Sequence, residues 1–131
     1  MSHPIERPED ARILIVDDQR TIVMLMTRML ESAGFGSVSG TTDPSTLQER
    51  CERDEPDLLV LDLTMPPFDG VDLLERLRPA DREPPLPVLV VSGHGRDSPH
   101  AHRARAAGAA DVLEKPFRAA ELVAAVKGAL A

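Results

Sequence analysis

The chain has few aromatic residues and a single cysteine. It contains three phenylalanines, no tryptophan and no tyrosine in 131 residues, so we expect a core built from aliphatic side chains and methionine. The lone Cys51 excludes an intrachain disulfide and a zinc site made of several thiolates. No apolar run approaches the length of a membrane span, and the N-terminus lacks the apolar segment of a signal peptide. A cytoplasmic location without membrane contact is therefore expected.

Basic residues are also in the minority. The formal net charge is -7, with 22 Asp and Glu against 15 Lys and Arg. A general nucleic-acid binder needs a basic surface that displaces counterions from phosphates, so direct nucleic-acid binding is not expected. The length suits one domain with one core. Residues 1–11 are polar and carry Pro4 and Pro8, so we assign them to an N-terminal tail and residues 12–131 to the domain.

Two kinds of apolar pattern alternate along the domain. Short continuous runs such as Ile13–Val16 are typical of strands buried on both faces of a parallel sheet. Each run precedes apolar residues at helical spacing, as in the stretch from Gln19 that Gly34 ends. We expect strands at 13–16, 35–40, 57–62, 87–92 and 110–115, and helices at 19–33, 43–55, 69–78, 97–107 and 117–130. This alternation predicts an α/β fold, a single doubly wound five-stranded parallel sheet with five helices on its two faces.

Polar residues end four of these strands. They are Asp17 and Asp18, then Asp62, Ser92 and Lys115. Parallel strands end at one edge of the sheet, so we expect these side chains to share a crevice. Two carboxylates about 4 Å apart repel by roughly 4 kcal/mol at an effective dielectric of about 20, so a proton or a cation must relieve them. Oxygen ligands favour Mg²⁺, and Mg²⁺ beside a lysine suits phosphoryl transfer to an aspartate nucleophile.

Four motifs occur in order and at the right spacing for one family: ILIVDD, LDLTMPPFDG, VLVVSG and LEKPF. Together they make residues 11–130 resemble the response-regulator receiver domain of two-component signalling. The resemblance implies a flavodoxin-like sheet of order 2-1-3-4-5. It also implies a phosphorylation-dependent switch, which receives a phosphoryl group from a sensor histidine kinase or a histidine phosphotransfer protein and then changes its surface for partner binding.

The resemblance also implies roles for individual residues around a metal. Asp62 would accept the phosphoryl group and would bind Mg²⁺ (or Mn²⁺) together with Asp18 and the backbone carbonyl of Thr64. Asp17 would act on the metal through a bound water.

Other roles carried over from the family concern the phosphoryl group itself. Ser92 would move to hydrogen-bond its oxygens, and Lys115 would pair with its charge. The bond from Lys115 to Pro116 would be a cis peptide, a form that X-Pro bonds adopt at low cost.

The chain departs from the family pattern at Val112, where a Tyr or Phe is usual. A β-branched valine cannot copy the swing of a ring, because its χ1 is stiff and its reach short. His94 lies two positions past Ser92 and Thr64 two past Asp62, so both would flank the phosphoryl group. We hypothesise that His94 tunes phosphoryl hydrolysis. A metal cluster of His94, His100 and His102 is not favoured, since no acid or cysteine completes it.

Several alternatives to a phosphorylated switch stay open. A receiver would not be a turnover enzyme, and a haloacid-dehalogenase-type enzyme would need an acid where Thr64 stands. A receiver-like interaction module that works without phosphorylation is a second rival. The chain has no effector segment after Leu130, so it either docks to an unknown partner or is the receiver piece of a larger regulator or hybrid kinase. The kinase, the pathway and the oligomeric state cannot be read from the residues.

Overall fold

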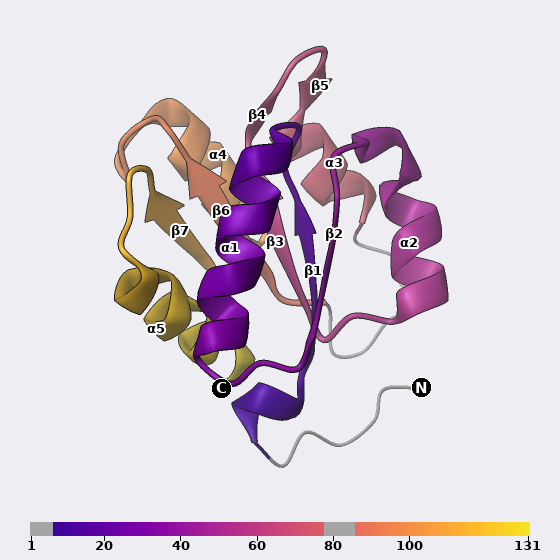
Figure 1. The fold of residues 1–131 in the computed structure, drawn as a ribbon. Coiled ribbons are helices and arrows are strands. Elements are labelled where there is room, and N and C mark those ends of the chain that lie inside the picture. Colours follow the sequence, from indigo (N-terminus) through magenta and orange to yellow (C-terminus); the bar gives the residue numbers. More distant parts are fainter. Residues whose placement is uncertain (1–6, 78–85) are drawn as a thin grey trace.

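A five-stranded parallel sheet forms the centre of the molecule, with helices on both faces (Figure 1). The computed structural model describes residues 7–77 and 86–131. The sheet order is β2-β1-β3-β6-β7, which is the predicted 2-1-3-4-5 order once a separate small hairpin is set aside. The strands are β1 Arg12–Val16, β2 Ser37–Thr41, β3 Leu58–Asp62, β6 Val88–Ser92 and β7 Asp111–Glu114. The predicted fold class is confirmed.

Burial along the strands follows their place in the sheet. Every residue of β3 and β6 is buried, because these strands have neighbours on both sides and helices above and below. The edge strand β2 has no fully buried residue. The continuous aliphatic run of β3, which predicted a strand buried on both faces, is therefore explained by its central place in the sheet.

Helices divide between the two faces of the sheet (Figure 1). The helices are α1 Arg20–Ser32, α2 Leu47–Asp54, α3 Gly70–Arg76, α4 Pro99–Ala106 and α5 Ala119–Leu130. One aliphatic cluster joins alternate strand residues to α1 and α5, and a second joins the remaining strand residues to α2, α3 and α4. The sheet thus separates two cores. Among the described residues, no helix is both long and apolar enough to cross a membrane.

Local signals set several helix ends. Helix α1 ends as predicted at Gly34, whose φ is 102°, and Phe35 N–H donates to the Leu30 carbonyl across the turn. Ser98 begins α4, because its hydroxyl accepts from Ala101 N–H at 3.1 Å. Asp69 begins α3 in the same way, accepting from Val71 N–H at 2.8 Å.

Some expected boundaries were wrong. The helix expected at 43–55 begins as a 3-10 turn, Pro44–Thr46, which Asp43 caps, and only then becomes α2. The weak strand lies at 37–41, and α5 begins at Ala119 rather than Phe117. The segment after Asp62, which carries Pro66 and Pro67, forms a hairpin of two short strands that the sequence did not predict, β4 Thr64–Met65 and β5 Phe68–Asp69. The prolines at 79, 84, 85 and 87 predict a stiff surface loop between the third helix and the fourth strand, and that loop lies mostly outside the described residues.

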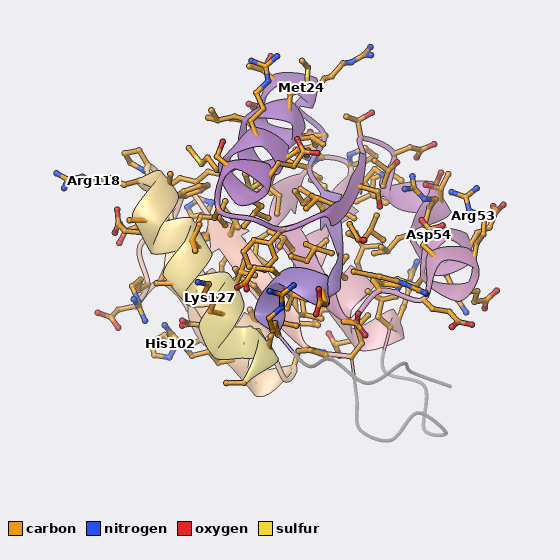
Figure 2. The ribbon with its side chains drawn as sticks, turned by 60° about the horizontal axis from the view of Figure 1, so that its bottom comes forward. Met24, Arg53, Asp54, His102, Arg118 and Lys127 are labelled. Atoms are coloured by element: carbon orange, nitrogen blue, oxygen red, sulfur yellow. The ribbon has the colours of Figure 1, made fainter. Side chains whose placement is uncertain are left out.

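Part of the predicted tail lies against the domain. Pro8–Asp10 form a 3-10 helix, and Ala11 is fully buried. Lys127 of α5 reaches this helix, with its Nζ 3.7 Å from a Glu9 carboxylate oxygen, and Figure 2 shows the two elements side by side. A three-residue helix and an ion pair between distant residues leave no apolar periodicity in the sequence.

Candidate functional site

Three carboxylates meet at the C-terminal edge of the sheet. Asp17 and Asp18 follow β1, and Asp62 is the last residue of the neighbouring strand β3. Each offers one oxygen, and these oxygens lie within 4.8 Å of one another. Asp17 and Asp62 are buried and Asp18 is exposed, so the group opens to solvent on one side. The topology brings these predicted residues together, as parallel strand ends require.

Asp17 is held by partners from three segments of the chain. Its side chain is fully buried, and its Oδ1 accepts from Gln19 N–H at 2.9 Å. Its own N–H donates to the Thr41 carbonyl at the end of β2, at 3.3 Å. The second oxygen, Oδ2, accepts from Lys115 Nζ at 3.3 Å. A buried carboxylate is costly without such partners.

Lys115 reaches the same group from 98 positions away in the sequence. It follows β7, and its N–H donates to the Ser92 carbonyl at 2.8 Å, which fixes where its side chain starts. Its Nζ lies 3.3 Å from Asp17 Oδ2 and 3.5 Å from Asp62 Oδ1. The ammonium group of Lys115 therefore forms ion pairs with two buried carboxylates. The lysine was expected at this edge, but its pairing with Asp17 was not foreseen.

The surroundings of Asp62 disfavour its charged form. Burial in the crevice, and next the negative charge of Asp17, raise its pKa from 3.8 to about 6. The charge of Lys115 and a bond from Thr64 N–H to Asp62 Oδ1, at 3.2 Å, act in the opposite direction. Burial and the charge of Asp17 outweigh these two effects, so the site favours added positive charge.

The turn after β3 places Thr64 beside the acids. Thr64 pairs with Asp69 across the hairpin, and Gly70 N–H donates to the Leu63 carbonyl at 3.1 Å. Only a glycine fits at position 70, because a Cβ there would lie 2.6 Å from Leu63 Cα. The structure has cis peptide bonds at Lys115–Pro116, where one was expected, and at Pro66–Pro67, where none was.

Ser92 is buried and its hydroxyl is fully engaged with the next loop. Its Oγ donates to the His94 carbonyl and accepts from His94 N–H, both at 3.0 Å. The His94 ring stacks on His100 of α4, with centroids 4.7 Å apart and planes at 12°. The sequence shows that these histidines are near neighbours but gives no signal for their stacking, because the two rings meet through the turn between β6 and α4.

The structure also places Val112 and His102, two residues considered from the sequence. Val112 is fully buried, pairs with Val90 of β6 and belongs to the core that contains α4. The side chain of His102 is exposed. In the part of the chain that the structure describes, the three aspartates form the one cluster suited to a metal, and the histidines do not.

The acidic group fits a hard divalent cation. It offers three carboxylates and one ammonium, so a net negative charge remains at close quarters. Its donors are all oxygens, which suit Mg²⁺ or Mn²⁺ better than softer metals. The exposed Asp18 leaves one side open to water and to an incoming anion. Chemically, such a crevice can hold a cation and place a phosphate beside a carboxylate oxygen.

Comparison with known proteins gives concordant matches. The response regulator receiver domain matches residues 13–127. The chain is 41% identical over 106 residues to protein-glutamate methylesterase/protein-glutamine glutaminase 1 of Anaeromyxobacter dehalogenans, covering 80% of this chain and 29% of that protein. It is 34% identical over 118 residues to the response regulator protein TodT of Pseudomonas putida, covering 90% of this chain and 50% of TodT.

Solved structures agree with this match. The receiver domain of NtrX from Brucella abortus is 32% identical, with a TM-score of 0.79, and the match covers 90% of this chain and 97% of that one. The chemotaxis response regulator CheY4 of Vibrio cholerae, at 24% identity, shares the fold with a TM-score of 0.82, over 92% of this chain and 99% of that one. The chain spans about half the length, or less, of the curated relatives given above. It belongs to the response regulator receiver domain family of two-component systems.

Proposed function

We propose that Asp62 accepts a phosphoryl group from a phosphohistidine of a sensor histidine kinase or a histidine phosphotransfer protein. The observation that carries the proposal is the position of Asp62, a buried carboxylate beside Asp17 and within 3.5 Å of Lys115 Nζ at the open edge of the sheet. Receiver domains pair with histidine kinases, which makes a phosphohistidine the donor of choice. The phosphorylated domain would then present an altered surface to a partner.

The transfer step uses one oxygen of Asp62. That oxygen attacks phosphorus, a P–O bond forms, the P–N bond of the phosphohistidine breaks, and the imidazole leaves with the electron pair and takes a proton from solvent. Lys115 Nζ, 3.5 Å from Asp62 Oδ1, is placed to neutralise charge on the transferred group. Ser92 supplies a hydroxyl that can donate to it.

Asp18, Asp62 and the Thr64 carbonyl would hold Mg²⁺ (or Mn²⁺), and Asp17 would act through a water. When bound, the cation offsets the negative charge of the acids and of the phosphoryl oxygens. The raised pKa of Asp62 supports this assignment, because a site that already disfavours its own charge gains from a cation. Asp17 keeps its bonds to Gln19 N–H and Lys115, which suits a supporting role.

The proposed domain is a switch rather than a turnover enzyme. Water would slowly hydrolyse the aspartyl phosphate and so return the domain to its starting state. Position 64, where a haloacid-dehalogenase-type enzyme needs a general acid, holds Thr64, which cannot act as one. His94 would tune that hydrolysis from the loop after Ser92. Unchanged dephosphorylation in His94→Ala would remove His94 from this role.

The test is intact mass after incubation with acetyl phosphate and Mg²⁺. The parent is expected to gain one phosphate, and Asp62→Asn is expected to gain none. Asp72→Asn, an exposed acid on α3, is the matched control and should behave as the parent does. Chelating the metal should abolish the gain. A gain that survives in Asp62→Asn, or a parent that never gains mass, contradicts the proposal.

A module that works without phosphorylation is the second candidate, and Val112 favours it. The side chain is fully buried in the core and offers no ring to relay a change at Asp62. A parent that binds its partner equally well with and without the phosphodonor would support this candidate. Binding that depends on the added phosphate would exclude it.

A further inference from the structure

We propose that the stacked His94–His100 pair couples Ser92 to helix α4 and carries the phosphorylation signal out of the site. This inference rests on the proposed phosphorylation of Asp62. It gives His94 a role besides the tuning of hydrolysis and assigns a role to His100, and it accounts for how a domain with Val112 transmits a change.

The first step concerns the single proton of the Ser92 hydroxyl. That proton is donated to the His94 carbonyl, while the same oxygen accepts from His94 N–H, both at 3.0 Å. A phosphoryl group on Asp62 has only acceptor oxygens. Ser92 can donate to it only by withdrawing its proton from the His94 carbonyl. A bond made at the phosphoryl group is therefore a bond lost at His94.

The second step takes the change from His94 to α4. The His94 ring lies parallel to that of His100, which is the second residue of α4. The loop between them is tied to the same helix, because Arg105 Nη1 donates to the Arg96 carbonyl at 2.7 Å and Ser98 N–H donates to the Gly95 carbonyl at 3.0 Å. A shift of the His94 backbone is thus passed to the start of α4.

The third step excludes the alternative, in which the side chain at position 112 of β7 transmits the change. Val112 is fully buried beside Val90, in the same cluster as Ala101 and Ala104 of α4. A β-branched side chain packed there has one preferred rotamer and cannot swing. Helix α4 also reaches the end of the turn after Asp62 through an ion pair between Arg103 and Asp69, at 3.5 Å. That pair is half-exposed and serves as a comparison in the test.

A shared metal ion is a poorer account of the two rings. Imidazole nitrogens bind a metal in the ring plane, and planes only 12° from parallel cannot both contain one ion. No third His, Cys, Asp or Glu joins them in the described ranges. The stacked geometry fits packing between loop and helix.

The test follows the histidine ring signals by NMR while mass spectrometry follows phosphorylation. Stacked rings shift each other's resonances, so the His94 and His100 signals should move together when acetyl phosphate and Mg²⁺ are added. The His102 signal should stay in place, since His102 lies at the outer edge of the molecule (Figure 2). Single His→Gln variants assign the three signals.

Variants then separate the relay from the phosphorylation. Because Ser92 itself would contact the phosphoryl group, Ser92→Ala is expected to gain phosphate mass more slowly than the parent does, but its phosphorylated fraction should lack the response of the His94 and His100 signals. His100→Gln should lose the shifts of the α4 backbone amides, whereas Arg103→Gln, on the same helix, should keep them. Phosphate gain with unmoved His94 and His100 signals, or an unaltered response in Ser92→Ala, overturns the relay alone. Failure of the parent to gain mass overturns the proposed function, and the relay with it.

Discussion

Asp62 carries its charge in a place that disfavours charge. Its pKa is raised to about 6, chiefly by burial and then by Asp17, while Lys115 offsets only part of this effect. A group whose folded pKa lies above the unfolded value contributes stability below the unfolded pKa and loses it as pH rises through the folded one. The free energy of unfolding of the metal-free protein should therefore fall as the pH rises from about 4 to about 6.

Asp62→Asn should remove this loss. In metal-free buffer at neutral pH, the free energy of unfolding of the variant is expected to exceed that of the parent by about 1–3 kcal/mol. This follows from a pKa shift of about two units at 1.36 kcal/mol each. Below the unfolded pKa of 3.8 the gain should vanish. Urea unfolding at several pH values measures it, with far-UV circular dichroism as the readout because the chain has no Trp. A difference that does not change with pH would contradict the argument, and added Mg²⁺ should shrink it.

Gly70 is a second residue on which the site depends. A Cβ at this position would lie 2.6 Å from Leu63 Cα and 2.9 Å from the Asp62 carbonyl, and backbone atoms cannot move aside easily. Gly70→Ala should cost about 1–3 kcal/mol of unfolding free energy, the usual range for overpacking. It should also slow phosphate gain by displacing the turn. Gly36→Ala, where nothing lies within 4 Å, is the control, and equal losses in both variants would refute the steric reason.

At the scale of elements, α4 depends on its first turn. The helix has only eight residues, and the Ser98 hydroxyl satisfies one of its free N–H groups. Ser98→Ala should cost about 0.5–2 kcal/mol in thermal or urea unfolding. Ser98→Asp keeps an acceptor oxygen and should retain most of the stability. A loss as large in Ser98→Asp as in Ser98→Ala would show that the cap is not the cause.

Most elements were predictable because each has a local signal. The runs of β3 and β6 are continuous and aliphatic, and Gly34 marks a helix end that the structure confirms. Asp43 and Ser98 are residues of the type that caps helices, and both accept from backbone N–H groups at the start of a helical segment. The β4–β5 hairpin was missed, since two-residue strands have no detectable alternation and depend on pairing between Thr64 and Asp69. The 3-10 helix before β1 was missed for a similar reason.

At the scale of the whole molecule, one sheet serves two cores. Leu74 of α3 packs in the core on one face and Leu122 of α5 in the core on the other, and both are fully buried. Leu74→Ala and Leu122→Ala should each lower the free energy of unfolding by about 2–5 kcal/mol. Because the strands belong to both cores, unfolding should remain one transition in each variant. The double variant should be additive within about 0.5 kcal/mol, and a two-step unfolding curve would contradict a shared sheet.

The residues by themselves determined the alternation of strand and helix, the acids and lysine at strand ends, and the resemblance to receiver domains. These are properties of neighbours in the chain, and hydrophobic periodicity reports them. They were sufficient for the fold class and for placing Asp17, Asp18, Asp62, Ser92 and Lys115 at one edge of the sheet.

Only the tertiary structure decided which partners those side chains take. Lys115 pairs with Asp17 as well as Asp62, the Ser92 hydroxyl is held by the backbone of His94, and His94 stacks on His100. Such contacts depend on distances set by strand register and loop path, which join residues as far apart as 98 positions. Periodicity along one strand carries no information about them, because it records which face a residue occupies and not what it meets there.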